Sequence, residues 1–294
     1  MLEIFLERFR QKSRTAAFPR DLPSLPPRFR GRPFIDTGRC DGVAGRECGF
    51  CAAACPLQAL LLEDGKPALD MGMCTFCGEC ARACPKSALV FTTDWRLAST
   101  IRKALVVRPA AYQAPERPDA GQTASEGLTS PNSPDNKRRY ALPELPLAPV
   151  TALDSVFARS FRLRQVTAAG CGACEADLNV LGTLVYDMER FGLDFVASPR
   201  HADAIILTGP LPRNIQTALK DCHAAMPAPK VVMAVGACAI SGGMFRNISS
   251  AAVGSVQGAS PHVDVNLFIP GCPPHPWTTL DALLRFIAPH SVSE

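Results

Sequence analysis

Long apolar runs are missing from this 294-residue chain, because no stretch approaches the 18 continuous apolar residues of a membrane-spanning helix. The first eleven residues mix charged and apolar side chains, unlike the apolar centre of a secretion signal. No G-x-G-x-x-G follows an expected strand, and no phosphate-binding P-loop is present. We therefore expect a cytoplasmic chain without a nucleotide-binding fingerprint.

Basic side chains are concentrated at the start of the chain. Residues 1–35 carry eight Arg or Lys against three Asp or Glu, a net charge of 8 − 3 = +5, whereas the whole chain has +4. No nucleic-acid-binding motif accompanies this charge, so we expect no nucleic acid partner. Residues 1–11 predict a short amphipathic helix, which either packs on its own domain or docks on a membrane-bound assembly. Five prolines predict extended coil over residues 15–35.

Cysteine is abundant, and twelve of the thirteen cysteines sort into three sets of four. Reduced thiols spaced this closely beside Gly and Pro indicate metal sites rather than disulfides. Eight of them lie between Cys40 and Cys84, and four are spread through the second half. Cys222 is left over, and we interpret it as a buried small apolar residue in the middle of a helix.

An internal repeat relates the first eight cysteines. The segment 48–56, with three cysteines and a terminal proline, reappears 29 positions later as 77–85. Such a repeat predicts two copies of one supersecondary unit, related by a pseudo-two-fold axis. Residues 60–69, with Asp64-Gly65 at their centre, predict a β-hairpin that joins the two copies.

The second copy reads Cys74-Thr-Phe-Cys77-Gly-Glu-Cys80-Ala-Arg-Ala-Cys84-Pro85. This spacing resembles that of bacterial two-cluster ferredoxins, in which the fourth cysteine of each motif binds the other cluster. The resemblance covers about residues 36–92 and implies an α+β two-cluster ferredoxin-like domain. It implies one [4Fe–4S] cluster on Cys74, Cys77, Cys80 and Cys55, and another on Cys40, Cys48, Cys51 and Cys84.

Cys40 departs from this pattern, because seven residues rather than two separate it from Cys48. Two glycines in the insertion, Gly42 and Gly45, allow an outward loop that returns Cys40 to its place. Without Cys40, this centre would be a three-cysteine cluster with a labile iron. A pair of four-cysteine zinc sites is the alternative, although zinc does not require the cross-over spacing.

From residue 160 onward, short apolar strands alternate with helices, which predicts a largely parallel, doubly wound α/β sheet. Because Cys171, Cys238 and Cys272 each follow the carboxyl end of a predicted strand, we expect them to converge on one rim of the sheet. The predicted strands are 161–169, 193–197, 204–208, 230–235 and 267–269, and the predicted helices are 175–191, 215–225 and 277–287.

Three stretches carry a second resemblance: Cys171-Gly-Ala-Cys174-Glu175, Ala234-Val-Gly-Ala-Cys238-Ala-Ile-Ser-Gly-Gly243 and Pro270-Gly-Cys272-Pro-Pro274. They resemble the module shared by [NiFe]-hydrogenase small subunits and the 20 kDa subunit of complex I, over about residues 160–288. The resemblance implies a flavodoxin-like domain and a third [4Fe–4S] cluster on Cys171, Cys174, Cys238 and Cys272, next to a partner large subunit. The complex I members usually begin with two adjacent cysteines. The C-x-x-C pair after Gly170, and the segment 199–210, therefore resemble the hydrogenase side more.

Three further residues are candidates for roles near this third cluster. Glu175 directly follows a proposed ligand and is a candidate proton relay, or it simply favours the positive end of the following helix. His201 and His275 are candidates for hydrogen bonds that tune the potential of the cluster, or they are ordinary structural histidines.

We expect four segments: a basic N-terminal arm over 1–35, a two-[4Fe–4S] ferredoxin-like domain over 36–95, a Pro-rich linker over 96–155 and a 20 kDa-like domain over 156–294. The resemblances imply an iron–sulfur electron-transfer subunit of a membrane-associated, complex I-related [NiFe]-hydrogenase or formate hydrogenlyase-like complex. It would relay single electrons to or from a catalytic partner. The alternatives are a quinone-side subunit of an NADH:quinone oxidoreductase-like complex and a free-standing ferredoxin-type carrier.

The same resemblances imply the partners. These are a hydrogenase large subunit or 49 kDa-like subunit, membrane-arm subunits, and an electron donor such as a formate dehydrogenase or a ferredoxin. The catalytic centre belongs to a partner, because no further pair of C-x-x-C motifs remains here to bind nickel. We expect the chain at the cytoplasmic face of the inner membrane, held there through its partners.

Overall fold

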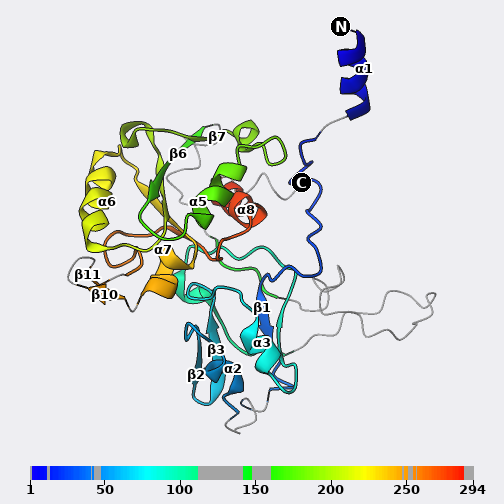
Figure 1. Ribbon diagram of the computed structural model, residues 1–294, viewed down its shortest axis with the longest axis vertical. Coiled ribbons are helices and arrows are strands. Elements are labelled where there is room, and N and C mark those ends of the chain that lie inside the picture. Colours follow the sequence, from blue (N-terminus) through cyan, green and yellow to red (C-terminus); the bar gives the residue numbers. More distant parts are fainter. Residues whose placement is uncertain are drawn as a thin grey trace.

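The computed structural model of the chain describes residues 2–11, 14–40, 42, 48–111, 142–147, 160–246, 248–250, 254–255 and 257–287. Figure 1 shows an α/β body built on a five-stranded sheet, with a smaller body of short strands packed against it. Within the described residues, no helix combines the length and the apolar composition that crossing a membrane requires.

The α/β body is organised around five parallel strands. They are β6 (Phe161–Thr167), β7 (Leu193–Phe195), β8 (Ala204–Thr208), β9 (Val231–Val235) and β12 (Leu267–Ile269). Their order in the sheet is β12-β9-β8-β6-β7, and every neighbouring pair is parallel. Strands β8 and β9 are buried along their whole length, because a parallel sheet is covered on both faces. The predicted parallel α/β sheet is thus confirmed.

Helices cover both faces of this sheet (Figure 1). On one face, α5 (Ala173–Val180) and α8 (Pro276–Ile287) pack against alternate strand residues such as Ile206. On the other face, α6 (Arg213–Ala225) and α7 (Ala237–Ser241) pack against the strand residues between them, such as Ile205. A small antiparallel pair, β10 (Ser249–Ser250) and β11 (Gly254–Ser255), completes this body.

The helix predicted over 175–191 is wrong in its extent. Helix α5 ends at Val180, and the chain resumes as a short 3₁₀ helix over Met188–Phe191. Residues 181–186 form turns between the two, and Asp187, with a left-handed φ of 46°, directly precedes the 3₁₀ helix. Leu184 and Val185, which lie between the two helices, are 63% and 46% exposed. Periodicity alone did not reveal this break.

The smaller body contains two antiparallel sheets and two short helices. Its elements are β1 (Pro33–Ile35), α2 (Phe50–Ala53), β2 (Leu60–Glu63), β3 (Lys66–Asp70), α3 (Glu79–Ala83), β4 (Leu89–Phe91) and β5 (Val106–Val107). Strands β2, β3 and β5 form one sheet, and β1 and β4 form the other. The predicted hairpin is confirmed, because β2 and β3 pair around Asp64 and Gly65. Both of these residues have the positive φ of a type I′ turn.

The repeat of 29 residues extends to unusual backbone conformations. Gly49 and Gly78 precede α2 and α3 with φ of 64° and 81°. Gln58 and Ser87 also correspond in the repeat, and both have positive φ, at 51° and 49°. A positive φ is uncommon in residues other than glycine. Its recurrence at matched positions indicates that both copies have the same local fold.

The N-terminal arm differs from the expected extended coil, because part of it packs into the core. Phe18 is buried between Trp95 and Trp277, with ring centroids 6.0 Å and 5.1 Å away. Further along, the arm supplies β1, which pairs with β4. In contrast, α1 (Leu2–Gln11) stands apart from both bodies in Figure 1, and its Phe9 is 82% exposed.

The linker predicted over 96–155 is wrong for its first part. Leu97 and Leu105 are buried in the core, and a 3₁₀ helix over Arg102–Leu105 leads into β5, which extends the hairpin sheet. Ser99 forms an antiparallel β-bridge with Phe268 of β12, so this segment joins the two bodies. Buried apolar side chains hold this stretch in place. Residues 112–141 and 148–159 lie outside the described part of the chain.

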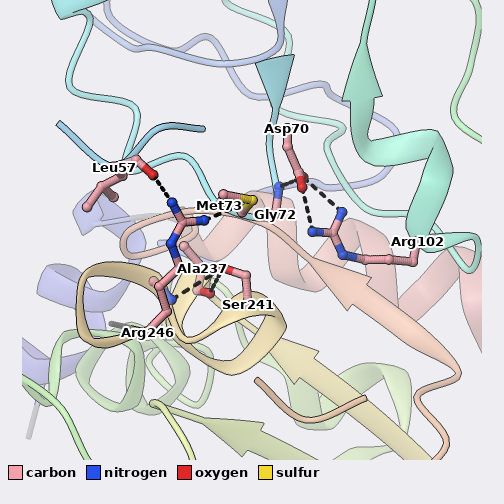
Figure 2. A network of polar contacts seen from close by, with 9 residues as sticks. Leu57, Asp70, Gly72, Met73, Arg102, Ala237, Ser241 and Arg246 are labelled. Atoms are coloured by element: carbon pink, nitrogen blue, oxygen red, sulfur yellow. Dashed lines mark hydrogen bonds and ion pairs between the residues drawn. The ribbon is translucent and has the colours of Figure 1, made fainter. Parts of the chain in front are cut away.

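An arginine of the α/β body reaches across to the smaller body (Figure 2). Arg246 donates hydrogen bonds to the Leu57 carbonyl oxygen and, at 3.3 Å, to the Met73 sulfur. Beside it, Arg102 forms a bidentate ion pair with Asp70 at 2.8 Å and 2.6 Å. The two bodies also share one apolar cluster, which includes Leu69 and Ile240. Their relative position is therefore defined by packing as well as by covalent connection.

Candidate metal centres

Four cysteines line a small apolar cavity between the two copies of the repeat. The cavity has a volume of about 30 Å³, and its walls include Ile35, Leu62 and Pro67. Its cysteines are Cys40, Cys48, Cys51 and Cys84. The first three come from the first copy and Cys84 from the second. The structure therefore brings together the set that the cross-over spacing implies.

A second cavity, of about 10 Å³, lies beside the hairpin and is lined by Leu60, Leu69 and Phe91. Its cysteines are Cys55, Cys74, Cys77 and Cys80. Here Cys55 comes from the first copy and the other three from the second. The two cavities are adjacent, because α2, which carries Cys51 of the first set, contacts α3, which carries Cys80 of the second.

The irregular position of Cys40 is accommodated by the hairpin turn. A side chain at Gly42 would come within 2.8 Å of the Gly65 carbonyl oxygen, so the glycine permits a close approach to the turn. Cys40 lines the first cavity with the regularly spaced members of its set. Residues 41 and 43–47 lie outside the described part of the chain.

The last four cysteines meet at the carboxyl ends of the parallel strands. Cys171 follows β6, Cys238 follows β9, and Cys272 follows β12, while Cys174 lies in the first turn of α5. Cys171, Cys238 and Cys272 all contribute to the electrostatic environment of Cys174. This is the convergence expected for ligands in open α/β sheets. Cys171 is exposed, so this set reaches the surface of the described chain.

Glycines allow the main chain to approach the thiols of the third set. A Cβ at Gly236 would lie 2.6 Å from the Cys174 sulfur, and one at Gly243 would lie 2.7 Å from the Cys238 sulfur. Both glycines have positive φ, at 88° and 53°. No larger residue fits these positions without moving a sulfur.

Burial controls the acidity of the thiols. Desolvation, followed by neighbouring charges, raises the pKa of Cys174 to about 12 and that of Cys238 to about 11. Desolvation also raises the pKa of Cys74 and of Cys80 to about 12. Such thiols stay protonated at neutral pH unless they coordinate a cation, which deprotonates them.

Backbone amides point at several of the sulfurs. Ala59 N–H donates to Cys55 and Ala88 N–H donates to Cys84, both at 3.2 Å and at equivalent positions of the repeat. Phe76 N–H donates to Cys74 at 3.2 Å. Amide donors stabilise thiolate charge and tune the potential of a bound cluster. The donor set therefore fits tetra-thiolate clusters. Among the described residues, no group of three or more His, Cys, Asp or Glu is arranged to hold a single metal ion.

Glu175 has a defined partner in the sheet. Thr208, a fully buried residue of β8, donates a hydrogen bond of 2.6 Å from its hydroxyl to the Glu175 carboxylate. The charge of Glu175 contributes to raising the pKa of the adjacent Cys174. The carboxylate also lies in the first turn of α5, near the positive end of the helix.

The two histidines differ in position. His275 Nδ1 accepts a hydrogen bond from Trp277 N–H at 3.2 Å, and its ring packs edge-on against Phe29. It therefore stays near Cys272 at the start of α8. His201 is exposed just before the amino end of β8, the opposite edge of the sheet from the cysteines.

The leftover cysteine is separate from the three sets. Cys222 lies on α6 beside Arg164, and burial raises its pKa whereas the arginine lowers it.

Sequence reasoning missed Arg246, because nothing in its local motif indicates that it reaches a loop almost 190 positions away.

Comparison with known proteins agrees with this geometry. A family model described as "NADH ubiquinone oxidoreductase, 20 Kd subunit" matches residues 171–286, and a "4Fe-4S dicluster domain" model matches residues 45–88. An NADH-quinone oxidoreductase subunit of Citrifermentans bemidjiense is 39% identical over 137 residues, 46% of this chain and 77% of that protein. The chain belongs to the 20 kDa subunit family. It carries a dicluster ferredoxin domain before the family domain, so the predicted fusion is confirmed.

Other similar proteins come from archaea. An uncharacterized protein of Methanocaldococcus jannaschii is 36% identical over 135 residues, which are 46% of this chain and 87% of that protein. A chain of the archaeal membrane-bound sulfane sulfur reductase, a respiratory membrane complex, is 27% identical. That match covers 46% of this chain and 73% of that one, with a TM-score of 0.38.

Proposed function

We propose that this member of the 20 kDa subunit family relays single electrons through three [4Fe–4S] clusters to or from a catalytic partner subunit. The observation that carries the proposal is the arrangement of twelve cysteines in three sets of four. Each set combines residues distant in sequence, which independent burial of thiols does not explain. The first two sets of cysteines line the two small cavities, and the third set lies at the carboxyl ends of the parallel strands.

The three sets form an ordered path. The set of Cys55, Cys74, Cys77 and Cys80 is adjacent to the first set through Cys51. It is connected to the third set through Arg246, which contacts Leu57 and Met73 next to its ligands. The main-chain N–H of Arg246 also donates a hydrogen bond of 3.4 Å to the Gly243 carbonyl oxygen. Gly243 in turn packs closely against Cys238. The second set therefore lies between the first and the third.

The residues of the chain would hold the clusters and shield them from water. When bound, each cluster accepts and releases one electron at a time. The apolar walls of the first two cavities exclude solvent, and the amide groups at Cys55, Cys74 and Cys84 stabilise the thiolate charge. The glycines at the rim allow the third cluster to lie close to the main chain.

The strand order of the α/β body supports a flavodoxin-like, doubly wound fold. Numbered along the chain, the five strands lie in the order 2-1-3-4-5, as in flavodoxin.

For the domain organisation, we propose that the ferredoxin-like unit continues to residue 111. Leu97, Leu105 and β5 support this boundary, because they pack with the hairpin rather than in a linker.

We also propose the kind of complex to which this chain belongs. The C-x-x-C pair at Cys171 and Cys174 supports a membrane-associated [NiFe]-hydrogenase or formate hydrogenlyase-like complex, with a hydrogenase large subunit as partner. Its donor would be a formate dehydrogenase or a ferredoxin. Similarity to the NADH-quinone oxidoreductase subunit of Citrifermentans bemidjiense supports a quinone-side role beside a 49 kDa-like subunit. In both, the chain would lie at the cytoplasmic face of the membrane, held by membrane-arm subunits.

Purification of the intact complex separates these two roles. A large subunit with four nickel-ligating cysteines and hydrogen-dependent reduction of the clusters are expected for the hydrogenase role. A large subunit without those cysteines, with quinone-dependent oxidation of the clusters, would establish the quinone role. A stable monomer without any large subunit would indicate a free-standing carrier.

Metal analysis tests the cluster proposal itself. We expect about twelve iron and twelve acid-labile sulfide per chain, since each cubane contains four of each. Eight iron would remove one of the three sites. Zinc in place of iron would refute the electron-transfer role, because zinc has no redox chemistry.

Glu175 is proposed as a proton relay beside the third cluster, with Thr208 holding its carboxylate in place. Glu175→Gln keeps an oxygen that accepts the Thr208 hydrogen bond but removes the carboxylate that can take up and release a proton. Loss of turnover with normal cluster reduction is the expected result. Unchanged turnover in the complex would assign Glu175 to helix stabilisation only.

A further inference from the structure

An open groove of about 430 Å³ lies on the ferredoxin-like body, separate from the two cysteine cavities. Arg28 and Arg30 of the N-terminal arm and Arg82 of α3 all line it. Gly78 and Ala81 also line the groove, and each directly follows a cysteine of the second set in the chain. Gly78 and Phe91 line both the groove and the second cysteine cavity, so the groove lies directly beside the proposed second cluster.

The groove is positively charged. Of its three arginines, only Arg82 has a carboxylate partner among the described residues, and this pair with Glu79 is exposed. Exposed ion pairs contribute little, so Arg82 remains available to a partner. Arg30 donates a hydrogen bond of 3.0 Å to the Phe76 carbonyl oxygen. Its Nε would lie 3.1 Å from a Cβ at Gly78, so its guanidinium is held directly against the cluster loop.

We propose that this groove is the docking site of an acidic redox protein that exchanges electrons with the second cluster. The inference rests on the proposed electron-transfer function. Opposite charge steers a protein partner to such a surface and orients it. Small ligands are usually enclosed by their pockets, whereas this groove is open and rimmed by exposed arginines, which favours a protein surface.

A segment of the same chain is a poor occupant. Residues 112–141 are not acidic overall, because they contain four acidic and four basic side chains. That stretch therefore has no excess negative charge to match the arginines of the groove. An acidic surface on a separate redox protein supplies this negative charge and places its redox group beside the cluster loop.

The test uses the full chain with its clusters and a small, strongly acidic flavodoxin as the probe. Its affinity and its rate of cluster reduction are measured at low and at high ionic strength. The test variant is Arg28→Glu with Arg82→Glu. The control, Arg200→Glu with Arg213→Glu, changes two exposed arginines of the α/β body and shifts the net charge equally. Arg30 is left unchanged because it contacts the cluster loop.

We expect the groove variant to weaken binding and slow reduction about tenfold or more at low ionic strength, and the control to change both less than about twofold. Equal effects in the two variants, or no effect in the groove variant, would overturn the proposal. Equally tight binding of a thymidine oligonucleotide that the groove variant abolishes would also overturn it, because the groove would then be a general polyanion site.

Iron content and reduction by dithionite are measured first on each protein. A wild-type chain that assembles no reducible clusters would contradict the proposed function. Intact clusters with unaltered flavodoxin binding in the groove variant would contradict only the docking site.

Discussion

The third cluster depends on a glycine that touches one of its ligands, which Gly243→Ala tests directly. A Cβ at position 243 would lie 2.7 Å from the Cys238 sulfur. This is about 1 Å less than the optimum separation of two non-bonded heavy atoms. Metal–ligand distances tolerate deviations of only about 0.2 Å. The substitution should therefore displace Cys238 far enough to prevent assembly of this cluster.

Gly172→Ala is the matched control, because it places the same methyl group beside the same cysteine set. Gly172 also has a left-handed φ, 78° against 53° for Gly243, but a Cβ there has no neighbour within 4 Å. The left-handed backbone costs roughly 1–2 kcal/mol for alanine in both variants. For a chain of this size, that corresponds to a loss of about 2–8 °C in melting temperature.

Iron and sulfide are measured per chain after anaerobic assembly, together with the electron paramagnetic resonance spectrum of the reduced protein. We expect Gly243→Ala to lose about four of the twelve irons and one set of signals, while Gly172→Ala retains all of them. Equal iron loss in both variants would attribute the defect to backbone strain. Full iron content in Gly243→Ala would refute the reasoning about the sulfur contact.

Three further predictions test the other contacts. Cys84→Ser should alter the centre of Cys40, Cys48 and Cys51 and leave the centre of Cys74 spectroscopically intact, whereas loss of the Cys74 centre would contradict the cross-over. Phe18→Ala should lower the free energy of unfolding by about 3 kcal/mol in urea, because this ring is buried against two tryptophans. The exposed control Phe9→Ala should change it by less than about 0.5 kcal/mol, and equal losses would mean that the arm is not part of the core. Arg246→Met should destabilise the contact between the two bodies by about 1.5–3 kcal/mol, since it removes charged hydrogen bonds to Leu57 and Met73. The exposed pair of Arg108 and Glu63 provides the control, with a loss below about 1 kcal/mol for Arg108→Met, and an Arg246 loss no larger than that would contradict the bridging role.

Much of the cysteine arrangement was predictable, because its geometry is local. In the second copy of the repeat, Cys74, Cys77 and Cys80 lie within one short loop and face the same cavity, whereas Cys84 after the following helix faces the other. The first copy follows the same rule apart from the longer spacing before Cys48. The matched φ angles of Gly49 and Gly78, and of Gln58 and Ser87, show that both copies obey the same constraint. The meeting of Cys171, Cys238 and Cys272 followed from strand alternation, since parallel strands end at a common edge.

Other features were not predictable from local pattern. Helix α5 ends at Val180 although its apolar periodicity continues, and residues 181–186 form turns instead. The segment 96–111 resembles a linker in composition, yet Leu97 and Leu105 are buried once the two bodies pack together. Phe18 lies in a Pro-rich arm and is buried because Trp95 and Trp277, which are far from it in the chain, both pack against its ring.

Spacing and periodicity were enough to predict the repeat of the first eight cysteines and the parallel class of the sheet, because both act over a few residues. The members of each thiol set were implied by the family resemblances, and the structure brings those members together. How the two bodies contact each other is seen only in the folded structure. Arg246 reaches Leu57, and Arg28 and Arg30 lie beside Arg82, through contacts between residues far apart in the chain. Such contacts depend on how whole elements pack, and no local pattern encodes that packing.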